Sequence, residues 1–72
     1  MNRYTEAKIA YSKILKDNAN YSMAYYGLGI VAEKEKNYRE AIGQYSKFIS
    51  MSDNDSLKKT IERRITLLRT RL

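Results

Sequence analysis

The 72-residue sequence contains no cysteine, histidine, proline or tryptophan. Without cysteine and histidine it has no disulfide, no Cys/His zinc site, no thiol nucleophile and no histidine acid–base chemistry. No glycine-rich phosphate loop follows a strand-like segment either. We therefore predict a non-enzymatic protein that uses no cofactor and no metal.

Long apolar runs are also missing. Nothing approaches the roughly 18 apolar residues that read as a membrane-spanning helix. The first residues, MNRYTEAK, lack the apolar core of a secretory signal. We expect no membrane contact and leave the compartment unknown, with the cytoplasm as the default assignment. At this length the chain is a single small domain, 1–72, which buries only about 60% of its unfolded surface.

The acidic residues give one weak hint of a metal site. Asp53 and Asp55 begin a stretch that resembles a calcium-binding loop. Such a loop needs glycine at its sixth position and glutamate at its twelfth, where this chain has Lys58 and Arg64. We interpret the aspartates as turn residues, and we expect Asp55 or Ser56 to cap the last helix.

The chain does contain an internal repeat. The segments RYTEAKIAYSKIL (3–15) and NYREAIGQYSKFI (37–49) align at a constant offset of 34 residues. The identical pairs are Tyr4/Tyr38, Glu6/Glu40, Ala7/Ala41, Tyr11/Tyr45, Ser12/Ser46 and Lys13/Lys47. Such self-similarity at a fixed period is the sequence signature of a repeat architecture.

The spacing of the apolar residues is helical throughout. Apolar side chains recur three and four positions apart, and short polar segments separate the runs. This pattern predicts an all-α fold of four antiparallel helices near 3–16, 22–35, 38–51 and 56–71. Asn37 and Glu40 are spaced as in a capping box at the start of the third helix.

A 34-residue helix–turn–helix unit resembles the tetratricopeptide repeat. The residues that carry the resemblance are Tyr25, Leu28, Gly29, Ala32, Tyr38, Ala41 and Tyr45. It implies the second helix of a partial repeat at 3–17, a full repeat at 22–55 and a basic capping helix at 56–72. The chain departs from the family pattern at Lys36, where the family has the glycine of the inner turn.

The resemblance also implies roles for particular residues. Gly29 and Ala41 stand where the family's two helices cross closely, whereas Gly27 has no role in the family. The first helix of each repeat lines a concave face. The residues of this chain at those positions are Met23, Tyr26, Ile30 and Glu33.

These positions lead to the main functional hypothesis. We expect a scaffold that binds a partner peptide or helix in an apolar concave groove. Some family members grip a terminal carboxylate with lysine and asparagine, but here Tyr26, Gly27 and Ile30 occupy those positions. We therefore expect a groove that is apolar and not cationic.

A second hypothesis is self-association. The helix at 3–15 lacks the partner helix that would precede it in a repeat. Either the chain is a segment of a longer repeat array, or another chain supplies the cover. The candidate contacts for a homo-oligomer are Tyr4, Ile9, Tyr11 and Ile14.

A third hypothesis rests on charge. The net charge is +6, and residues 56–72 carry six of the fourteen basic side chains against one acidic one. The basic residues are Lys58, Lys59, Arg63, Arg64, Arg69 and Arg71. They could bind an acidic protein or nucleic acid, although 56–72 has no aromatic residue for base stacking. The alternative is that they complement the helix dipole and keep a terminal cap soluble.

Overall fold

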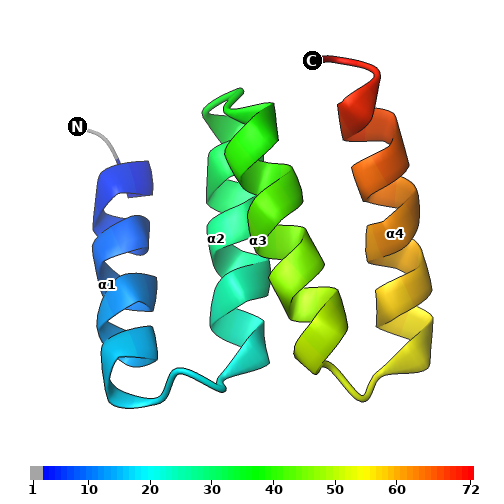
Figure 1. Cartoon of the computed structure of the whole chain (residues 1–72). Helices are drawn as coiled ribbons and strands as arrows, with labels where there is room; N and C mark the ends of the chain where they lie inside the picture. Colours follow the sequence, from blue (N-terminus) through cyan, green and yellow to red (C-terminus); the bar gives the residue numbers. More distant parts are fainter. Residues whose placement is uncertain (1–2) are drawn as a thin grey trace.

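The computed structural model describes residues 3–72, and all the regular structure in that range is α-helical. Four helices, α1 (Arg3–Asp17), α2 (Ser22–Lys34), α3 (Tyr38–Met51) and α4 (Asp55–Arg69), run alternately up and down (Figure 1). The predicted all-α fold of antiparallel helix hairpins is therefore confirmed, with helix ends one or two residues from those expected. Met1 and Asn2 of the predicted 1–72 domain lie outside the described residues.

The helices form a row in chain order. α1 packs on α2, α2 on α3 and α3 on α4, and α1 and α4 stand at the two ends. The molecule measures 29 × 28 × 15 Å along its principal axes, so it is a thin slab with two broad faces. Because the backbone of each helix packs only against its neighbours along the chain, the arrangement has the one-dimensional character of a repeat protein.

The hydrophobic core lies towards the α4 end of the row. Its buried members come from α2, α3 and α4: Ala32, Ala41, Tyr45, Phe48, Ile61, Ile65 and Leu68. By contrast, α1 contributes no buried residue. The first helix is therefore attached to the others by partly exposed contacts, among them a 2.8 Å ion pair between Lys8 and Glu35.

Asparagine side chains begin the last two helices. The Asn37 side chain accepts a 3.4 Å hydrogen bond from the Glu40 backbone N–H, which confirms the predicted cap of α3. The Glu40 carboxylate in turn accepts a hydrogen bond from the Asn37 side-chain amide. For α4 the prediction was wrong: the cap is Asn54, which accepts from the Leu57 N–H at 3.0 Å. An asparagine caps as well as aspartate or serine, so composition could not decide among adjacent candidates.

The turn between α2 and α3 is closed by a Schellman motif. The Asn37 N–H donates to the Ala32 carbonyl at 2.8 Å, and the Lys36 N–H donates to the Glu33 carbonyl at 3.0 Å. Lys36 has a φ of 63°, in the left-handed region that favours glycine. The residue that departs from the family pattern therefore still adopts the backbone conformation for which that pattern has glycine.

A tyrosine ring packs directly against each of two glycines of α2. A Cβ on Gly29 would lie 2.5 Å from Cδ1 and Cε1 of Tyr45, and a Cβ on Gly27 would lie 2.6 Å from both Cε atoms of Tyr11. Tyr11 and Tyr45 are equivalent positions of the 34-residue repeat. Gly27, which has no role in the family resemblance, thus lets α1 pack on α2, just as Gly29 lets α3 pack on α2.

Candidate functional site

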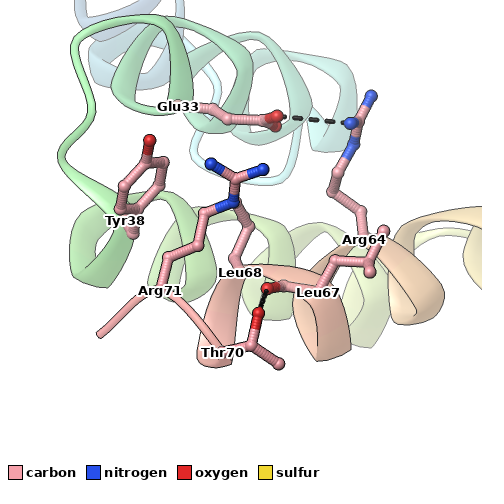
Figure 2. A pocket seen from close by; sticks show the side chains of 7 residues that line it. All are labelled: Glu33, Tyr38, Arg64, Leu67, Leu68, Thr70 and Arg71. Carbon is pink, nitrogen blue, oxygen red and sulfur yellow. Dashed lines mark hydrogen bonds and ion pairs between the residues drawn. The ribbon is translucent and has the colours of Figure 1, made fainter.

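Two adjoining recesses open between α2 and α4. The first, which we call the anchor recess, has a volume of ≈ 250 Å³ and is lined by Tyr26, Ile30, Glu33, Lys34, Tyr45, Thr60, Ile61 and Arg64. The second, the arginine recess, has a volume of ≈ 220 Å³ and is lined by Glu33, Tyr38, Arg64, Leu67, Leu68, Thr70 and Arg71 (Figure 2). Glu33 and Arg64 line both, so the recesses form one continuous α2–α4 groove.

An ion pair crosses the groove where the two recesses meet. One oxygen of Glu33 lies 3.2 Å from an Arg64 guanidinium nitrogen, and the other accepts a 2.8 Å hydrogen bond from the Tyr45 hydroxyl. Burial raises the pKa of the Tyr45 phenol, and the hydrogen bond to the Glu33 carboxylate raises that pKa further. The phenol therefore stays protonated and fixes the carboxylate that Arg64 binds.

The floor of the anchor recess is apolar and belongs to the core. The Tyr26 ring packs on Phe48, with 5.4 Å between ring centroids, and on Tyr45, with 6.3 Å. Tyr26 and Ile30 are each partly buried against the core cluster. Since Phe48 and Tyr45 are almost fully buried, these side chains hold their positions before any ligand arrives.

The arginine recess has a different character. The Arg71 guanidinium lies 5.7 Å from the centroid of the Tyr38 ring. In Figure 2 this guanidinium points into the space between Tyr38 and Arg64, below Glu33. Over residues 3–72, no carboxylate forms an ion pair with Arg71. Leu67, with 61% of its surface exposed, is an apolar residue of the same recess.

The structure brings together three of the four residues predicted to form the groove. Tyr26, Ile30 and Glu33 line the anchor recess, whereas Met23 does not line it and is 44% exposed. The α2 wall is only partly apolar, because it carries Glu33 and Lys34 beside Tyr26 and Ile30. The α4 wall carries Arg64, and a second arginine, Arg71, lies beyond it.

The α4 wall is the part of the site that the sequence analysis missed. Thr60, Arg64, Leu67 and Arg71 follow one another at intervals of four, three and four residues, which is the spacing of one helix face. This spacing is visible in the sequence. The sequence does not indicate that this face of the helix lies opposite α2, because the apolar stripe of the same helix packs on α3.

The residues proposed for self-association do not share one surface. Tyr11 packs on Gly27 of α2, while Tyr4, Ile9 and Ile14 are 40%, 63% and 39% exposed. At about 100° per residue, Ile9 points about 140° away from both Tyr4 and Ile14, which lie about 80° apart around α1. Ile9 therefore stands on a different face of the helix from the other two.

The basic residues of the last segment are likewise divided among several surfaces. Arg64 and Arg71 line the arginine recess, and Arg69 lines a separate recess beside Glu62. The Lys58 ammonium lies 4.0 Å from Asp55. The two remaining side chains, Lys59 and Arg63, are exposed and line none of these recesses.

No group of three or more His, Cys, Asp or Glu residues that could hold a metal ion occurs within residues 3–72. In the same range, no helix is both long enough and apolar enough to cross a membrane. No family model, curated protein or solved structure matches the chain. The site is therefore interpreted from its own geometry.

Proposed function

We propose that this chain is a non-enzymatic interaction module that binds a peptide segment of another protein in the α2–α4 groove. The observation that carries the proposal is the anchor recess, where Tyr26 and Ile30 reach the surface on a floor made by the core. An apolar side chain of a partner would bury there against residues that are already in place. We also propose that the fold is of the tetratricopeptide kind, on the strength of the 34-residue repeat.

The size of the recesses favours a peptide over a small molecule. Pockets for small ligands typically measure about 300–1,000 Å³ and enclose most of the ligand. The two recesses, at ≈ 250 and ≈ 220 Å³, are smaller and sit side by side in one groove. Such a shape suits successive side chains of a peptide better than one compact molecule.

The rigidity of the floor supports the same proposal. Ordering a loose side chain on binding costs roughly 0.5–1.5 kcal/mol, a cost that a pre-organised surface avoids. Tyr26 is fixed by two aromatic neighbours. Glu33 is fixed by the Tyr45 hydroxyl and by Arg64. Both walls are thus formed before the peptide binds.

The proposal can be tested with a phage-displayed library of random twelve-residue peptides selected against the folded chain. The enriched peptides are then synthesised and their affinities measured for two variants. Thr60→Tyr places a ring in the anchor recess. Thr66→Tyr makes the same change about 1.7 helical turns further along α4, in a different recess. The two threonines are matched, because each is exposed and each hydroxyl donates to the carbonyl four residues before it.

We expect the enriched peptides to share an apolar anchor residue. We also expect Thr60→Tyr to weaken their binding by ~10-fold or more, because a filled recess removes about one buried side chain of apolar contact. The Thr66→Tyr variant should bind as the wild type does. A selection that enriches no peptide, or peptides that tolerate Thr60→Tyr, would overturn the proposal.

The two alternative hypotheses have less support. The four candidate contacts of α1 do not form a single surface for a second copy, because Tyr11 packs on Gly27 and Ile9 faces away from the other exposed residues. The basic residues of α4 point to several sides, so they do not present one polyanion-binding face. Light scattering over a range of concentrations tests the first alternative, since a homo-oligomer would show a mass that rises above that of the 8.4 kDa chain.

A further inference from the structure

We infer that the peptide bound in the α2–α4 groove carries an acidic side chain, aspartate or glutamate, whose carboxylate enters the arginine recess and pairs with Arg71. The inference rests on the proposed function, because it specifies the chemistry of the same groove. The ligand class is therefore an acidic peptide with a neighbouring apolar anchor residue.

The charges of the groove are unbalanced. Its titratable lining consists of three cations, Lys34, Arg64 and Arg71, and one anion, Glu33, besides three tyrosines. The charge of Glu33 is already engaged by Arg64 and by the Tyr45 hydroxyl. Among residues 3–72, Arg71 therefore has no carboxylate within ion-pair distance, so an anion in the arginine recess would be favoured.

Arg71 is also positioned to bind a carboxylate. Its guanidinium lies over the Tyr38 ring, and a cation held on an aromatic face keeps its N–H edge available. That planar edge matches the two oxygens of a carboxylate, which it can bind through two parallel hydrogen bonds. Resting on Tyr38 also restricts the side chain, so less conformational freedom is lost when the acid binds.

The contents of the recess fit this ligand. A volume of ≈ 220 Å³ accommodates a carboxylate side chain together with a few waters, each of which takes about 30 Å³. The exposed side chain of Leu67 gives the same recess an apolar surface for the stem of the acidic residue. The carboxylate of an aspartate or glutamate can therefore bind Arg71, and its aliphatic stem can pack on Leu67.

A nucleic acid is the less suitable anion. The aromatic faces that could stack on bases are already used, since Tyr38 lies under Arg71 and Tyr26 packs on Phe48. The apolar floor of the anchor recess, formed by Tyr26 and Ile30, has no counterpart in a sugar–phosphate backbone. A peptide, by contrast, can present an apolar side chain and an acidic one at the same time.

The geometry also fixes the spacing of the two side chains. In α4 and the turn that follows it, the lining residues of the anchor recess are centred about six positions before those of the arginine recess. At the helical rise this separation is ~9 Å. An extended peptide advances about 3.3 Å per residue. The acid should therefore lie about three residues from the apolar anchor in an extended ligand.

The test uses the twelve-residue peptide library and the full chain. Peptides selected on the wild type should show aspartate or glutamate at a fixed spacing from the apolar anchor. One enriched peptide is then synthesised and compared with a variant peptide in which the acidic residue is replaced by the corresponding amide residue. We expect the amide to bind ~10-fold more weakly, the scale of one lost charge-assisted hydrogen bond.

Two arginine variants complete the thermodynamic cycle. In Arg71→Gln the difference between acid and amide should vanish. Arg63→Gln removes the same charge from an exposed site outside both recesses, and there the difference should persist. Circular dichroism confirms that both variants are folded before binding is compared.

Each contrary result is distinct. If no peptide is enriched, the proposed function fails. If anchored peptides are enriched but acid and amide bind equally, the proposed function stands and the acidic ligand is wrong. A preference for the acid that survives Arg71→Gln, or single-stranded DNA that competes with the peptide at equal concentration, also overturns the inference.

Discussion

The hydroxyl of Tyr45 donates a 2.8 Å hydrogen bond to Glu33, and this contact joins the core to the groove. The Tyr45 ring is 1% exposed and lies against Gly29, while its polar end emerges beside the ion pair that crosses the groove. One residue of the repeat pattern thus packs two helices together and orients a charged group of the candidate site.

This contact predicts a loss of stability at high pH. The pKa of the folded Tyr45 phenol is raised above its ordinary value of 10.0. The folded state therefore holds the proton more tightly than the unfolded state does. The resulting stabilisation is complete below pH 10.0 and is lost as the pH rises through the folded-state pKa.

The Tyr45→Phe variant isolates this effect. Above pH 10.0 the free energy of unfolding of the wild type should fall more steeply than that of the variant, by up to ~1.4 kcal/mol per pH unit. Urea titrations followed by circular dichroism between pH 8 and pH 11.5 measure both curves. Parallel curves for the two proteins would contradict the prediction.

Gly29→Ala should destabilise the fold. The new Cβ would meet Cδ1, Cε1 and Cγ of Tyr45, near the base of a buried ring that cannot turn away. Strain of about 1–3 kcal/mol then exceeds the helix-propensity gain of about 1 kcal/mol. Gly43→Ala is the control: nothing lies within 4 Å of its Cβ, so it should raise the free energy of unfolding. Equal changes in the free energy of unfolding for the two variants, measured by urea titration, would contradict the prediction.

Gly27→Ala should act locally. Its Cβ would meet Cζ and the Cε atoms at the tip of the Tyr11 ring, on a helix that contributes nothing buried. Tyr11 can shift, so we expect α1 to loosen while α2, α3 and α4 stay folded. Hydrogen exchange should show faster exchange of α1 amides with little change in α3. Uniformly faster exchange would mean that α1 is integral to the core.

Lys36→Gly should stabilise the chain by ~1 kcal/mol, because Lys36 has a φ of 63° and its Cβ is disfavoured in that conformation. Lys34→Gly removes the same charge from the last residue of α2, where the conformation is still helical, and should cost up to about 1 kcal/mol. Thermal unfolding measures both. The prediction fails if the two glycine variants shift the midpoint in the same direction.

Alanine substitutions at equivalent positions of the repeat should lower the free energy of unfolding by very different amounts. Phe48 is fully buried, whereas Ile14, 34 residues earlier, is 39% exposed. Phe48→Ala should cost about 3–5 kcal/mol, and Ile14→Ala less than about 2 kcal/mol. Urea titration compares the two. Similar losses would show that α1 is buried in solution, as it would be in an oligomer.

Much of this arrangement could be predicted from local pattern. Helical spacing and polar breaks located four helices to within one or two residues, and Asn37 was recognisable as a cap. The cap of α4 was expected one or two positions too late, at Asp55 or Ser56, because neighbouring polar residues are equally suited to capping. The α2 wall of the candidate site followed from the repeat, whereas its α4 wall did not.

The sequence by itself determined the helices, their order and the positions that repeat. Helix formation depends on the local spacing of apolar residues and on the polar segments that separate the helices. Only the tertiary structure decided which side chains meet. It placed Gly27 under Tyr11, turned the flank of α4 towards α2, and placed Arg71 over Tyr38 with no carboxylate of residues 3–72 in ion-pair contact. The physical reason is that a helix fixes the direction of each side chain about its own axis, whereas packing against neighbouring helices fixes the rotation of that axis.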